Sequence, residues 1–122
     1  MRQWAKKLRK AFTLVEIMIV IAIVGVLVAI AIPNYMKARK TARAKMCQEN
    51  LAKITGAVDQ WAFENNKSQG ESGPEMTVLV GPEKFLKRTA YCPIGNTPYE
   101  VPNVGQDAAC PNVAEHPLHK LP

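Results

Sequence analysis

The sequence predicts an α+β protein with a long, kinked N-terminal α-helix and a small Pro-rich head that contains a short β-hairpin. Three observations predict this fold. Residues 12–32 are an apolar run that is long enough to cross a membrane. Apolar side chains then recur at helical spacing through residues 47–61. Residues 68–122 hold eight of the nine prolines, which is too many for a helical domain.

The excess of positive charge lies at the N-terminus. Five of the 16 Lys and Arg residues precede position 12, and the other 11 face ten Asp and Glu residues. The net charge of +6 is therefore weak support for nucleic-acid binding. We expect a transmembrane helix at 12–33, an amphipathic extension of that helix at 34–66 and a globular head at 67–122; a separate cytoplasmic leader at 1–11 is what the family resemblance given below implies.

The apolar run has the length of one membrane crossing, about 30 Å as a helix. A cleaved secretory signal peptide has a shorter apolar stretch and a small-residue cleavage site, which residues 33–37 do not provide. A buried core helix is excluded because the remaining chain is too small to cover it. An ordinary signal anchor fits. The basic leader places the N-terminus in the cytoplasm, although residues 37–45 are also basic and oppose that orientation.

The predicted helix continues beyond the membrane to about position 65. Cys47, Leu51, Ile54, Val58 and Trp61 follow steps of four and three, which places them on one helix face. We expect this face to pack on the C-terminal region, in preference to a coiled-coil seam, which needs more heptads. The basic residues of 37–45 form a solvated face, with lipid headgroups, DNA or an acidic neighbour as alternative partners.

The head is too small to bury a core of its own, so it must pack on the helix face at 47–61. Pro and an acidic residue at the start of residues 82–87 predict a short helix, with Phe85 and Leu86 facing inward. Residues 99–101 alternate between prolines, as an edge strand does, and a partner strand is expected at 108–110.

No residue set in the chain indicates catalysis, a cofactor or a metal. Cys92, Cys110, His116 and His119 are candidate ligands, but their spacing matches no zinc pattern. A disulfide between two of the three cysteines, with both histidines on the surface, is the favoured interpretation. The sequence holds no phosphate-binding Gly-rich loop and no hydrolase motif. We therefore expect a protein that is not an enzyme and uses no cofactor.

The start of the apolar run carries a specific resemblance. The chain begins with a basic leader, followed by Ala11, Phe12, the residues Thr-Leu-Val-Glu and an aliphatic run. This order of features resembles the class III signal of type IV pilins and type II secretion pseudopilins. The resemblance implies cleavage between Ala11 and Phe12 and methylation of the new N-terminal Phe12. Ala11 stands where the family usually has Gly. Gly25 and Pro33 fall where family members carry a flexible Gly and a helix-kinking Pro.

Glu16 is the one acidic residue of the apolar run, and the resemblance gives it a role in assembly. Cleavage before Phe12 creates an ammonium group within one helical turn of Glu16 or on a neighbouring subunit. Either charge left alone among apolar helices is costly, so the pair would fix the register between subunits. The alternative is a solvated, idle Glu16 at the level of the lipid headgroups. The stretch between Gly25 and Pro33 either unwinds in a filament or only permits close packing.

The end of the chain carries a second resemblance, to small pilin-like proteins with a Cys-Pro-x-Gly pattern, a Tyr and a later Cys. It implies that a disulfide between Cys92 and Cys110 braces the head, for a gain of about 3 kcal/mol in an oxidising compartment. Cys47 is then a buried free thiol or the alternative partner of a head cysteine.

Together these features predict a structural subunit, a major pilin or pseudopilin, of a type IV pilus-like or type II secretion filament. The expected partners are further copies in a helical filament, a prepilin leader peptidase and methyltransferase, and an inner-membrane assembly platform. DNA is a partner only if the filament is a competence pilus. We expect a single-pass inner-membrane precursor with a cytoplasmic N-terminus, and then a periplasmic or cell-surface filament.

One observation and one alternative function stand beside this prediction. Only Glu100, Asp107 and Glu115 are acidic within residues 89–122, so the acidic calcium loop of many major pseudopilins is not evident. This weakens the secretion assignment relative to the pilus. The alternative function is an uncleaved, single-pass anchored binding module whose basic neck contacts DNA or anionic lipid.

Overall fold

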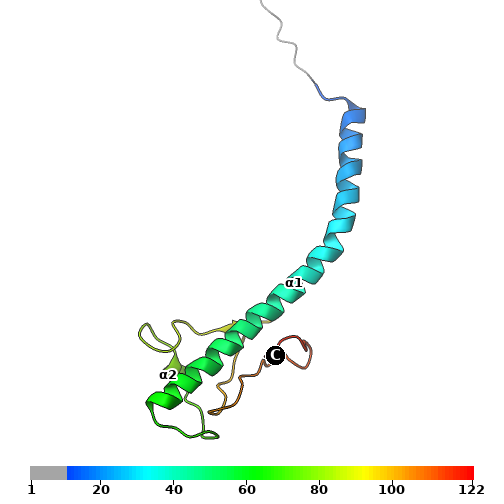
Figure 1. Cartoon of the computed structure of the whole chain (residues 1–122). Helices are drawn as coiled ribbons and strands as arrows, with labels where there is room; N and C mark the ends of the chain where they lie inside the picture. Colours follow the sequence, from blue (N-terminus) through cyan, green and yellow to red (C-terminus); the bar gives the residue numbers. More distant parts are fainter. Residues whose placement is uncertain (1–10) are drawn as a thin grey trace, which may run out of the picture. The chain divides into compact units, whose positions relative to one another are not determined.

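A computed structural model describes residues 11–122 of the chain (Figure 1). The chain divides into two compact units, Met1–Lys37 and Ala38–Pro122, and each is described by itself. The predicted leader at 1–11 lies outside the described residues except for Ala11. The α+β class is confirmed, because a long helix is joined to a head with a two-stranded antiparallel sheet.

Helix α1 spans Leu14–Glu64, and the helix continues through Pro33. Its predicted end near position 65 is confirmed, and the reason is local. Asn66 adopts a left-handed backbone conformation with φ 51°, and the N–H of Lys67 donates to the carbonyl of Ala62 at 2.8 Å. This arrangement closes a helix by satisfying its last carbonyl groups. The kink at Pro33 stays a prediction.

The head contains one short helix, α2, at Met76–Leu79. The predicted helix at 82–87 is wrong, because backbone pairing across the segment takes its place. The N–H of Gly81 donates to the carbonyl of Leu86 at 2.8 Å, and the N–H of Leu86 donates to the carbonyl of Leu79 at 2.9 Å. Phe85 and Leu86 are half-buried against the core, as expected.

A short hairpin is present, but its predicted position is wrong. Strands β1 (Tyr91–Cys92) and β2 (Thr97–Pro98) pair antiparallel, with Cys92 opposite Thr97. Gly95 and Asn96 supply the positive φ angles, 68° and 51°, that a tight connection requires. The segments 99–101 and 108–110 form no strand, and Tyr99 is buried in the core instead.

The core of the second unit lies between α1 and the head, as the helical spacing predicted. The head chain folds back along the C-terminal part of α1 (Figure 1). The side-chain amide of Gln48 donates to the carbonyl of Leu118 at 2.8 Å, which ties the last segment to the helix. Trp61 is half-buried at the margin of the core. The buried α1 residues are Ala44, Cys47, Leu51, Ile54, Ala57, Val58 and Ala62.

Candidate functional site

The first half of α1 exposes its apolar side chains all around. Within residues 14–32 the large apolar side chains are between 44% exposed, at Val28, and 79% exposed, at Leu14. The helix is long and apolar enough to cross a membrane by length and composition. No described part of the chain covers this surface. A surface of this kind needs lipid or other helices around it.

The helix start shows a feature that the sequence reasoning missed. The N–H of Glu16 donates to the hydroxyl of Thr13 at 3.2 Å, so Thr13 is the N-cap and Glu16 is the third helical residue. The signal for it was the spacing Thr-x-x-Glu, which is typical of a helix N-terminus. An acidic side chain in the first turn also interacts favourably with the helix dipole. Glu16 therefore has a local role in the single chain, beside any role in assembly.

The predicted processing and assembly residues lie at separate places along the first unit. Ala11 and Phe12 precede the helix in a non-helical segment, and both are exposed, Phe12 by 77%. A Cβ atom added to Gly25 would meet no atom within 4 Å. Nothing within the described single chain therefore requires Gly at position 25.

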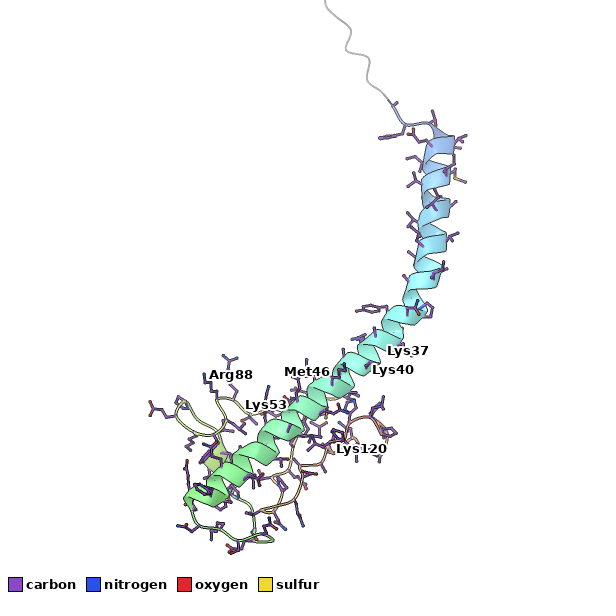
Figure 2. All side chains as sticks on the ribbon, viewed as in Figure 1. Lys37, Lys40, Met46, Lys53, Arg88 and Lys120 are labelled. Carbon is purple, nitrogen blue, oxygen red and sulfur yellow. The ribbon has the colours of Figure 1, made fainter. Side chains whose placement is uncertain are left out.

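The basic segment after the apolar run is solvated for the most part, as expected. Arg39, Lys40 and Lys45 are exposed, whereas Arg43 is half-buried. Figure 2 shows Lys40 on α1, and Lys53 further along the same helix toward its C-terminal end.

The second candidate site is a buried cluster of three cysteines and a histidine in the head. Cys92 Sγ lies 3.5 Å from Cys110 Sγ and 3.7 Å from His119 Nδ1, and Cys110 Sγ lies 3.9 Å from His119 Nδ1. The expectation that both histidines lie on the surface is wrong for His119, which is 2% exposed. All three cysteines are buried and free, and the disulfide between Cys92 and Cys110 stays a prediction.

The sequence reasoning also missed that Cys47 joins this cluster. One donor atom each from Cys47, Cys92, Cys110 and His119 lies within 4.8 Å of the others. The signal that could have found it was present. Cys47 lies on the helix face that the head was expected to cover, so its thiol had to meet residues of the head.

The surroundings of the cluster shift the pKa values of its groups in different directions. Burial raises the pKa of the Cys110 thiol to about 12 and also raises the pKa of the Cys47 thiol. Burial alone would raise the pKa of Cys92 too. Hydrogen bonds from the Asn112 side chain and the Ile94 backbone outweigh that effect and bring it below its ordinary value. Burial lowers the pKa of His119, which keeps its ring neutral near neutral pH.

Comparison with known proteins adds independent information. The prokaryotic N-terminal methylation motif matches residues 6–32. The chain is 30% identical over 109 residues to the type II secretion system core protein G of Pectobacterium carotovorum, covering 80% of this chain and 69% of that protein. It is 36% identical over 88 residues to the competence protein ComGC of Bacillus subtilis, covering 70% of this chain and 83% of that protein. The chain belongs to the family of type IV pilins and type II secretion pseudopilins.

The resemblance stated from the sequence is thus confirmed. The type IV major pilin PilA of Myxococcus xanthus is 38% identical over 58 residues, but this match covers only 48% of the chain and 26% of that protein. No solved structure matches the chain significantly. A membrane-anchored subunit fits both the pilin family and the long apolar helix.

Proposed function

We propose that the chain is a structural subunit, a major pilin or pseudopilin, of a type IV pilus-like or type II secretion filament. It has no catalytic role. The leader at 1–11 is removed between Ala11 and Phe12, and Phe12 is methylated. The helix at 12–33 then assembles with its copies, the extension at 34–66 carries the head, and the head at 67–122 faces outward.

The observation that carries the proposal is the exposed apolar surface directly after a prokaryotic N-terminal methylation motif. In the precursor, lipid surrounds this surface. In a filament, the same surface packs against neighbouring helices, so assembly exchanges lipid contacts for well-packed protein contacts. The processing bond at Ala11 and Phe12 lies in an exposed, non-helical segment, which suits access by a peptidase.

Glu16 and the new N-terminus of Phe12 set the register between subunits in this proposal. Glu16 begins as part of the N-terminal turn that Thr13 caps. Once cleavage creates the ammonium group, the carboxylate gains a partner that a neighbouring helix can supply. The stretch between Gly25 and Pro33 unwinds on packing, since Pro33 removes one helix hydrogen bond and Gly25 has weak helix propensity. A filament structure with regular helix through this stretch would refute the unwinding.

The partners follow from this cycle. A prepilin leader peptidase and methyltransferase acts on the precursor in the inner membrane, where the N-terminus is cytoplasmic. An inner-membrane platform assembles the subunits into a periplasmic or cell-surface filament. Relatives carry names from both type II secretion and competence. DNA is a partner of this chain only in the competence case.

N-terminal analysis of protein extracted from membranes tests the processing step. We expect the chain to begin at a methylated Phe12, with a mass that lacks the first eleven residues. A chain that begins at Met1 in filament-producing cells would overturn the proposal and favour an anchored binding module.

Substitution of Glu16 tests the assembly step. We expect Glu16→Ala to reach the membrane at normal levels but to lower the recovery of sheared filaments by about tenfold or more. Glu49→Ala is the matched control, because Glu49 is an exposed acid of the same helix beyond the apolar run. Normal filament yield from Glu16→Ala, with normal cleavage, would refute the register role.

A further inference from the structure

Four potential metal ligands from distant parts of the chain converge in the core of the head. Cys47 comes from α1, Cys92 from β1, and Cys110 and His119 from the segment that follows the hairpin. Their donor atoms all lie within 4.8 Å of one another. The side chains are buried, with exposed fractions of 0%, 0%, 2% and 2%. Four soft or borderline donors therefore lie close together in a place that is closed to solvent.

The separations among the Cys92, Cys110 and His119 donors are close to those of a tetrahedral metal site. A zinc–sulfur bond of about 2.3 Å and tetrahedral angles separate neighbouring sulfur ligands by about 3.8 Å. In the structure, Cys92 Sγ lies 3.5 Å from Cys110 Sγ, and His119 Nδ1 lies 3.7 Å from Cys92 Sγ and 3.9 Å from Cys110 Sγ. Cys47 Sγ lies within 4.8 Å of these three donors, so side-chain shifts would be needed to bring all four to bonding distance of a central ion.

Polar groups around the cluster donate to its sulfur atoms. The Tyr99 hydroxyl donates to Cys47 Sγ at 3.2 Å, and the Asn112 amide donates to Cys92 Sγ at 3.3 Å. Three thiolates and one divalent cation carry a net charge of −1 in a buried place. Donors to thiolate sulfur stabilise such a charge, and outer hydrogen bonds of this kind orient ligands in metal sites.

A disulfide would bond only two of the four clustered side chains, whereas a metal ion can bind all four. A bond between Cys92 and Cys110 would leave Cys47 with the hydrogen bond from the Tyr99 hydroxyl alone, and it would not bond the buried His119 ring. Any other pair of the three cysteines leaves one thiol over in the same way. A metal ion satisfies all four groups at once.

We propose that Cys47, Cys92, Cys110 and His119 bind one structural Zn²⁺ ion that fastens the head to α1. Three cysteines and one histidine with no open position are a ligand set of structural zinc sites. The head needs such a fastening, since within the described residues its regular structure is a four-residue helix and two two-residue strands. Binding would couple the folding of the head to the metal.

The test uses the full chain extracted from membranes in mild detergent without chelator. We expect about one zinc per chain by elemental mass spectrometry. We also expect three cysteines that react with an alkylating agent after unfolding without reductant. Removal of zinc with a chelator should make the head more sensitive to protease, and added Zn²⁺ should restore resistance. Co²⁺ in place of zinc should give the visible absorption of a tetrahedral ion and a thiolate-to-cobalt charge-transfer band.

Matched histidine variants locate the site. His119→Gln should retain less than about a tenth of the zinc and lose the protection that added Zn²⁺ gives against protease. His116→Gln should retain the zinc, because His116 lies only three residues away but outside the donor cluster. Should the His119 variant fail to accumulate, the Co²⁺ spectrum of the wild-type chain still decides the question.

Several results would overturn the proposal. They are a disulfide between any two of the three cysteines in metal-free protein, iron or copper in place of zinc, or full zinc retention by His119→Gln. None of these results bears on filament formation, because cleavage before Phe12 and the register role of Glu16 depend on the first unit. Failure of the zinc site and failure of the filament proposal are therefore distinguishable.

Discussion

Replacement of Leu51 by Ala should weaken the packing of the head on α1. Leu51 has no exposed surface and belongs to the cluster that joins the helix to the hairpin region. Removal of a fully buried leucine side chain costs about 3 kcal/mol, since the loss of burial adds to the cavity that remains. A unit of this size has a total stability of about 4–13 kcal/mol. The substitution therefore removes a large share of it and raises the unfolded fraction more than about 100-fold.

The assay is urea unfolding of the full chain in detergent, followed by tryptophan fluorescence, because Trp61 lies half-buried at the margin of the core. Met46→Ala is the matched control. Met46 lies on the same helix (Figure 2). Its side chain is 56% exposed, so its loss should change the stability by no more than about 0.5 kcal/mol. Equal unfolding midpoints for Leu51→Ala and Met46→Ala would refute the packing of the head on this helix face.

Three further predictions concern stability. Gly73→Ala should lower the melting temperature, with a loss above about 1 kcal/mol, because an added Cβ would collide with the carbonyl oxygen of Pro102. Gly56→Ala should raise the melting temperature, with a gain in stability of about 0.5–1 kcal/mol, since an added Cβ meets nothing within 4 Å and Ala favours helix. Hydrogen bonds from the Ser68 backbone and then from Lys67 lower the pKa of Glu71 below 4.5. The carboxylate therefore stabilises the fold above pH 4.5. Glu71→Gln should melt below wild type near neutral pH, and this difference should vanish as pH falls through the lowered pKa. Thermal scans by circular dichroism at several pH values check all three, and no measurable change with Gly73→Ala would contradict the steric argument.

The helix and its buried face were predictable because they depend on local spacing. Steps of three and four residues from Cys47 to Val58 fix one side of a helix, whatever the head does. The polar stretch after Glu64 likewise determines the helix end through the backbone of Asn66. Residues 12–32 were predictable for the same reason, since length and composition alone distinguish them.

The details of the head were not predictable, because contacts between distant residues fix them. The segment 82–87 has the composition of a helix start, yet the N–H of Gly81 donates to the carbonyl of Leu86, and the N–H of Leu86 donates to the carbonyl of Leu79. The hairpin depends on the left-handed backbone conformation of Gly95 and Asn96. The alternation of side chains at 99–101, on which the prediction rested, contains no information about that turn. The head has few hydrogen-bonded elements, and all of them are short. Local sequence patterns are therefore too weak to determine which segment forms each helix or strand.

The cysteine cluster shows the same limit for the candidate site. Sequence spacing compared Cys92 and Cys110 with the nearby histidines and found no zinc pattern. The set that assembles in the structure instead combines Cys47, which lies 45 residues before Cys92, with His119 from the returning end of the chain. Such a set follows from the fold and not from any short motif.

The exposure of α1 separates two roles along one helix. Its apolar side chains are exposed within residues 14–32, whereas the buried residues all lie between Ala44 and Ala62. The first part therefore depends on partners outside the chain, and the second part has its partner in the head. Because the two parts belong to different compact units, Glu16→Ala should impair assembly with a stable head, and Leu51→Ala should destabilise the head while cleavage before Phe12 continues. Opposite responses of assembly and head stability to these two substitutions would show that the two parts of α1 act separately.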